Sequence, residues 1–135
     1  MRCLLLLLVL VGLTDALSAQ VRFAPTSNPR ERSRQTELAG LLSRSVPYLA
    51  PDTYAVWWDE VVEICQCEPK VRSDDLNWRK MVDAAQHERG AFWGGVNVMF
   101  IMGDDINDRL VIRHEMLHAV LGGDPDHRAK AWKRL

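Results

Sequence analysis

The sequence carries almost no net charge, and this shortage excludes two classes of protein. Its 17 basic residues nearly balance its 18 acidic ones, giving a net charge of −1 over 135 residues. A nucleic-acid-binding domain is normally strongly basic, so we expect no nucleic-acid partner. The same balance of charges disfavours an acidic disordered chain. The length is that of one ordinary domain, which we expect to be a monomer.

The sequence also lacks a hydrophobic run long enough to cross a membrane. Its longest apolar stretch, residues 4–13, has ten residues, whereas a transmembrane helix needs about 20. Arg2 precedes this stretch and the small residues Ser18 and Ala19 follow it, which is typical of a secretory signal peptide. We therefore predict a signal peptide at residues 1–19, a secreted (extracellular or periplasmic) mature protein, and no stable membrane anchor after cleavage.

Cysteine is scarce, so disulfides do not define the fold. Only Cys65 and Cys67 remain after the predicted signal peptide. A bridge between residues two apart needs a tight, strained ring, and zinc sites of this kind usually contain two pairs of cysteines spaced by two to four residues. We therefore expect structural cysteines at a helix end, or a partner outside this chain, rather than an internal disulfide or a metal site.

The rest of the sequence predicts an α+β fold in which a small mixed sheet packs on helices. Residues 20–35, which contain two prolines and several arginines, are interpreted as a flexible leader. The folded domain is expected to cover residues 36–135. It begins with leucines at helical spacing, which predict a helix that stops at Pro47.

A second helix is expected from Asp52 or Thr53, either of which can cap it, to Ile64. It contains the pair Trp57 and Trp58. Tryptophan brings a large apolar area wherever it is buried, so we expect this pair to pack in the core rather than to bind a ligand.

Two strands are predicted in the middle of the chain. Residues 76–82 form the first, and the apolar run at residues 96–102 forms the clearest one. The segment between them contains several glycines around Phe92 and Trp93, and we interpret it as rich in turns.

A long buried helix is predicted after the second strand. Asp104 or Asp105 is placed to cap its first turn, and Gly122 and Gly123 are placed to end it. The intervening residues contain neither proline nor glycine and are apolar on nearly every side of the helix. Such a helix is typically buried in a core.

The motif His-Glu-x-x-His lies on this helix, as His114, Glu115 and His118. At 3.6 residues per turn, a separation of four residues puts both imidazoles on one face, where they can bind one metal ion. Glu115 is turned by about 100° from His114, which places it beside the metal ion rather than among the ligands. That is the position of a general base that activates water at a catalytic zinc ion.

A catalytic zinc site usually has three protein ligands, and the sequence offers few candidates for the third. No glutamate follows Glu115. The two glycines and the following proline favour a turn that lets His127 return to the metal ion, so we favour His127. Asp124 and Asp126 stay open as alternative ligands, or as hydrogen-bond partners of a ligand imidazole. His87 is interpreted as a loop histidine.

These residues resemble the zincin metallopeptidases, and most of all the metzincins, whose motif helix ends at glycine before a third histidine. The resemblance implies a zincin-like fold, Zn2+ held by His114, His118 and His127, and Glu115 as the general base. It also implies that an edge strand, here residues 96–102, pairs with an extended peptide substrate. The spacing is non-standard, because His127 follows His118 by nine residues where the metzincin pattern has six.

We therefore expect a secreted zinc metalloendopeptidase that acts on peptide or protein substrates. Two alternatives remain at this point. The first is a non-catalytic zinc-binding module in which an aspartate and a histidine after the glycines complete the coordination shell. The second is a zinc hydrolase that acts on a non-peptide amide or ester.

Overall fold

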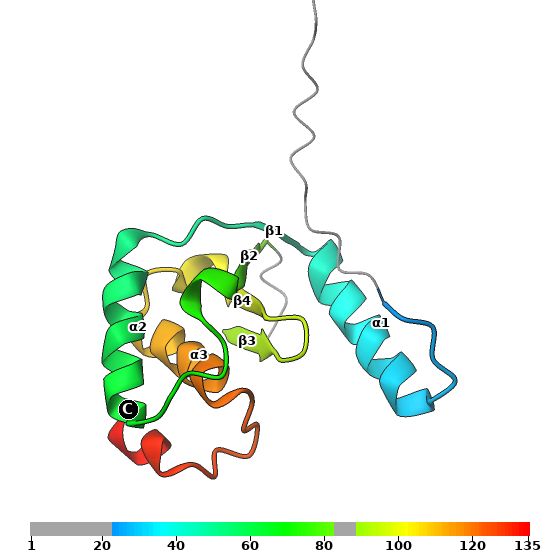
Figure 1. Cartoon of the computed structure of the whole chain (residues 1–135). Coiled ribbons are helices and arrows are strands. Elements are labelled where there is room, and N and C mark those ends of the chain that lie inside the picture. The colour runs from blue at the N-terminus through cyan, green and yellow to red at the C-terminus, as the bar shows by residue number, and fades with distance from the viewer. Residues whose placement is uncertain (1–22, 83–88) are drawn as a thin grey trace, which may run out of the picture.

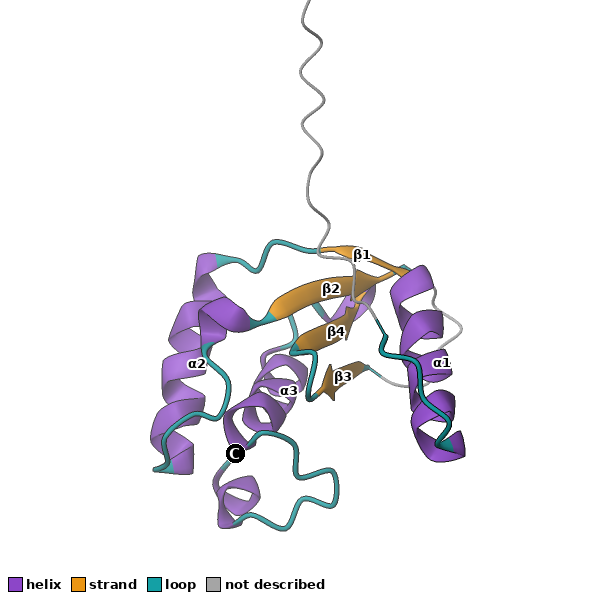
Figure 2. Cartoon of the chain, turned by 45° about the vertical axis from the view of Figure 1, so that its right-hand side comes forward, coloured by secondary structure: helices purple, strands orange, loops and turns teal. Residues whose placement is uncertain are grey.

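The computed structural model describes residues 23–82 and 89–135 and shows a mixed α+β fold in three layers (Figures 1 and 2). A four-stranded sheet forms the middle layer. Helix α1 (Pro29–Ser43) covers one face of it, and α2 (Asp52–Cys65) and α3 (Arg109–Leu121) cover the other. The predicted signal peptide and His87 lie outside the described residues. No helix in the described ranges combines the length and apolar character needed to cross a bilayer.

The sheet has the strand order β1-β2-β4-β3, with bounds β1 Ser45–Pro47, β2 Asn77–Met81, β4 Val98–Met102 and β3 Gly90–Trp93. Strands β2 and β4 are parallel, and the two outer pairs are antiparallel. Side chains alternate along β4, so that Met99 and Ile101 pack against α2 and α3 while Val98 and Phe100 pack with α1. This strand therefore joins the two halves of the core.

The predicted strands at residues 76–82 and 96–102 are confirmed with shorter bounds, but the edge position expected of residues 96–102 is wrong. Strand β4 lies between β2 and β3, and its residues 98–101 are at most 1% exposed. A continuous apolar run marks a strand that is buried on both faces, and such a strand lies inside a sheet. The described sheet has two edge strands, β1 and β3. Strand β3 lies in the segment predicted to be rich in turns, and its Ala91 pairs with Phe100 of β4.

The folded domain begins before residue 36, where we expected it to start. Helix α1 starts at Pro29, so residues 29–35 belong to this helix and not to a flexible leader. The Asn28 side chain accepts a hydrogen bond from the backbone N–H of Arg30, and Pro29 occupies the first helical position. Both are standard signals of a helix start, and here they outweigh the arginine-rich composition. Leu38 and Leu41 then anchor the helix on the sheet.

Helix α2 runs close to its predicted bounds, with Trp58 buried in the core and Trp57 packed against it. Its end corrects the expectation for the cysteines, because Cys65 and Cys67 form a disulfide. Gln66 between them adopts the left-handed conformation (φ 54°) that ends the helix. The turn brings the two Cα atoms to 5.1 Å, within the ordinary range for a disulfide.

Helix α3 is capped by Asp108, and not by Asp104 or Asp105, which lie in a preceding 3-10 turn. The Asp108 carboxylate accepts hydrogen bonds from the N–H groups of Leu110 and Val111, at 3.0 and 3.2 Å. The helix has 13 residues and packs between α2 and the sheet, as its apolar sequence predicts. It ends at Gly122 in the left-handed conformation (φ 73°), as expected.

Candidate metal centre

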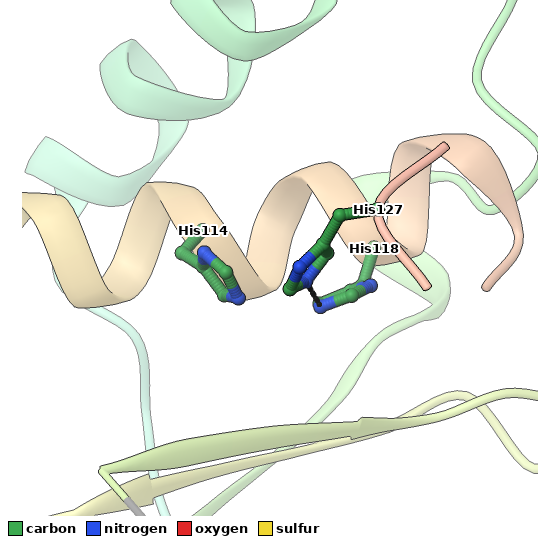
Figure 3. A group of neighbouring side chains, drawn as sticks. All are labelled: His114, His118 and His127. Carbon is green, nitrogen blue, oxygen red and sulfur yellow. Dashed lines mark hydrogen bonds between the residues drawn. The ribbon is translucent and has the colours of Figure 1, made fainter. Parts of the chain in front are cut away.

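Three predicted ligands come together beside α3. His114 and His118 project from one face of the helix, one turn apart, with ring centroids 5.0 Å from each other. His127 arrives from the loop that follows the helix, and its ring centroid lies 4.9 Å from each of the other two (Figure 3). One nitrogen from each ring can be chosen so that all three lie within 4.8 Å of one another. The three side chains thus face a common point.

The loop after α3 turns sharply because four of its six residues have positive φ. These are Gly122 (73°), Gly123 (137°), Asp124 (60°) and His127 (52°). Glycine adopts such angles at little cost, and aspartate and histidine tolerate them better than most residues. The turn folds the chain back along the helix, so that His127 Nε2 lies 3.1 Å from His118 Nε2.

Asp124 organises this loop and is not part of the histidine cluster. Its carboxylate accepts hydrogen bonds from the N–H groups of Arg128 (3.0 Å) and Ala129 (2.8 Å) and from Trp132 Nε1 (2.7 Å). These donors, the Ala129 N–H first, hold the pKa of Asp124 below its usual value. Asp126 is exposed and pairs with Arg128 at 2.8 Å. Of the three candidates for the third ligand, only His127 lies with the other histidines.

Trp132, which no sequence pattern indicated, lies beside all three histidines. Its ring centroid lies 5.0 Å from that of His114, 4.6 Å from that of His118 and 4.2 Å from that of His127. It lies in the 3-10 helix Lys130–Arg134, and Arg134 ties that segment to α2 by donating to the carbonyl oxygen of Ile64 at 2.9 Å. The sequence of residues 128–135 shows no hydrophobic periodicity that would predict this contact.

The hydrogen bonds of His118 fix which of its nitrogens faces the cluster. Its Nδ1 lies 2.8 Å from the carbonyl oxygen of Gly123, which can only accept, so Nδ1 carries the proton. The lone pair is then on Nε2, which points toward His127. A backbone carbonyl in this role is a common partner of metal-binding histidines.

Burial keeps His114 and His118 in the neutral form that binds metal ions. Desolvation lowers the pKa of His114, and the neighbouring His118 and His127 lower it further. Desolvation is also the main cause that lowers the pKa of His118, with the Gly123 carbonyl and Asp124 acting in the opposite direction. Both imidazoles therefore favour the neutral state required of a ligand.

One pair of nitrogens in the cluster has the spacing of neighbouring ligands in a zinc site. Zn–N bonds of 2.0–2.1 Å in a tetrahedral site place neighbouring ligand nitrogens about 3.3 Å apart. The Nε2 atoms of His118 and His127 are 3.1 Å apart. Within the described ranges no Cys, Asp or Glu joins the three histidines, so the cluster could offer three protein ligands to a metal ion.

Glu115 lies in the same cleft and is buried between α3 and β3, with 7% of its surface exposed. The cleft has a volume of about 610 Å³ and is lined by the three histidines, Glu115, the strand β3 and the loop after α3. A Cβ built on Gly90 of β3 would lie 2.7 Å from Cγ of Glu115. The absence of a side chain at this position therefore leaves room for the carboxylate.

The replacement Gly90→Ala is expected to displace Glu115 without removing a ligand. A misplacement of about 1 Å can cost 10²-fold in rate. For the zinc peptidase that we propose below, we therefore expect cleavage to fall by about 10- to 100-fold while zinc content stays unchanged. Gly40→Ala on α1 is the matched control, since a Cβ at this position would meet nothing within 4 Å and Gly40 does not line the cleft. Steady-state kinetics and metal analysis compare the two variants. Equal activity of both would contradict this role of Gly90.

The replacement Asp124→Asn is expected to weaken zinc binding by about 10-fold or more, because loss of a partner outside the ligand shell typically costs 10–100-fold in metal affinity. Asparagine tolerates the left-handed backbone but has only one acceptor oxygen for three donors. Competition with a chromophoric chelator measures the affinity. Asp126→Asn, which changes an exposed neighbour, is the control and should bind zinc like the wild type. An unchanged affinity in Asp124→Asn would contradict the organising role.

No protein-family model matches the chain, and neither does any curated protein or solved structure.

Proposed function

We propose that the protein is a secreted zinc-dependent peptidase of the zincin type. The observation that carries the proposal is the convergence of three histidines on one wall of a cleft that also contains a buried glutamate. His114, His118 and His127 would hold the metal ion, and Glu115 would act as the general base. When bound, zinc would supply a Lewis acid that polarises the scissile carbonyl and lowers the pKa of water to about 7.

The residues of the chain have separate tasks in this proposal. The Glu115 carboxylate accepts the proton of the attacking water and returns it to the leaving amine. His118 keeps its orientation through the Gly123 carbonyl, and Asp124 with Trp132 holds the loop that carries His127. Edge strand β3 borders the cleft, and an extended peptide can add to such an edge by main-chain hydrogen bonds.

The contacts of the two aspartates favour this function over a non-catalytic zinc module. A closed site needs a fourth protein ligand. Asp124 already accepts three hydrogen bonds, and Asp126 is paired with Arg128 at the surface. Substitution with cobalt distinguishes the two cases, because an exchangeable water in the spectrum indicates an open site. The adjoining strand edge supports an extended peptide over a small amide or ester as the substrate.

The decisive experiment is to purify the protein and to measure its bound zinc together with cleavage of a peptide mixture. We expect one zinc ion per chain and cleavage that a chelator abolishes. A protein that binds no stoichiometric zinc would refute the proposal, and one that binds zinc but cleaves no peptide would refute the peptidase activity.

A further inference from the structure

The histidine-lined cleft continues into a second cavity beside α1. This cavity has a volume of about 320 Å³ and lies between the start of α1 and the turn that follows β3. Arg34 and Gly94 line both spaces, so the two adjoin at these residues. The walls of the second cavity are largely apolar and include Phe23, Leu38 and Trp93.

Arg34 lies where the two cavities adjoin and carries a positive charge that a ligand can reach. Its guanidinium carbon lies 5.7 Å from the ring centroid of Trp93, within the range of a cation–π contact. Across the described residues Arg34 has no ion-pair partner, and its side chain is exposed. Stacking on tryptophan orders the guanidinium and leaves its N–H groups free to bind a carboxylate by two parallel hydrogen bonds.

The charges around the cleft are asymmetric. Among its described lining residues Arg34 carries the only permanent positive charge, whereas Glu115 lies buried beside the histidines. Glu31, three residues earlier on α1, lines the second cavity, and the described residues show no ion pair between it and Arg34. A negative group on a bound molecule is therefore favoured at the Arg34 end.

Strand β3 runs between the contacts of these two ends. It runs from Gly90, which packs against Glu115, to Trp93, on which Arg34 stacks. Three steps of about 3.3 Å separate the two positions, or about 10 Å. An extended peptide paired with β3 would span the same distance in about three residues.

On the basis of the proposed peptidase function, we propose that Arg34 selects substrates with a carboxylate about three residues from the scissile bond. The carboxylate can belong to an acidic side chain or to the end of the peptide. Both have the same chemistry and would bind the same guanidinium. Arg34 is thus a specificity-determining residue, and it takes no part in bond cleavage.

The test uses octapeptides in which one glutamate, or one glutamine, occupies each position in turn of a constant alanine–serine sequence. Each peptide is made with a free and with an amidated C-terminus. Cleavage by the zinc-loaded wild type is followed by mass spectrometry, and binding to the uncleaving Glu115→Gln variant is followed by fluorescence anisotropy of labelled peptides. Arg34→Gln is compared with Arg32→Gln, a control on the same helix that lines neither cavity.

We expect glutamate to be preferred over glutamine by about 10-fold or more at one position, as for a charge-assisted hydrogen bond. Arg34→Gln should reduce this preference to about 2-fold or less, Arg34→Lys should keep part of it, and Arg32→Gln should keep all of it. A preference for the free over the amidated C-terminus that Arg34→Gln removes identifies the terminal carboxylate as the recognised group. A preference for glutamate that survives Arg34→Gln, or the absence of any preference in wild type, overturns the proposal. A protein that binds acidic peptides through Arg34 but cleaves none overturns the peptidase function and supports the carboxylate site.

Discussion

Glu115→Gln is expected to lower the rate of peptide cleavage by about 10³-fold while leaving one zinc ion bound to each chain. The amide has nearly the same shape as the carboxylate, so it fills the same buried space beside Gly90. It cannot accept the proton of the attacking water, and this loss affects kcat rather than the binding of metal. Cleavage rates and zinc content, measured on the same preparation, test both halves of the expectation.

The control for this variant is Glu63→Gln, which makes the same chemical change on the exposed surface of α2. It should be indistinguishable from the wild type in both measurements. If Glu115→Gln cleaves as fast as Glu63→Gln, Glu115 is not the base and the proposed mechanism is wrong. If it loses zinc as well as activity, Glu115 contributes to the metal site itself.

The histidine cluster was predictable because most of its determinants are local in sequence. His114 and His118 face the same way on any α-helix, and the two glycines end that helix wherever it lies. Nearby turn residues also predict that the chain brings His127 back toward the helix. They do not decide whether His127 or one of the two aspartates joins the cluster. That choice depends on Trp132, whose indole donates to Asp124 from eight residues away.

The parts of the fold that the sequence did not predict depend on distant partners. Strand β3 has only four residues and forms because β4 offers it a free edge. The capping residue of α3 could not be chosen from the sequence either, because Asp104, Asp105 and Asp108 are all residues of a type that caps helices. Arg89, just before β3, donates to both Asp105 and Asp108, so a residue far along the chain fixes both carboxylates where the helix begins.

His127→Ala is expected to reduce zinc affinity by more than about 100-fold. Loss of a residue that only hydrogen-bonds a metal ligand already costs about 10–100-fold, and loss of a ligand should cost more. The side chain is exposed and its loss leaves Asp124 and Trp132 in contact, so we expect the fold to persist. Isothermal titration with zinc and a circular dichroism spectrum measure the two properties.

Asp126→Ala is the matched control for His127→Ala because Asp126 precedes it directly in the same loop and was an alternative ligand. Its pair with Arg128 is exposed, and pairs of this kind contribute little to stability, so zinc binding should equal that of the wild type. The opposite pattern, with zinc lost in Asp126→Ala and kept in His127→Ala, would make the aspartate the third ligand. The loop would then have to rearrange on binding metal, because only the histidine now lies with His114 and His118.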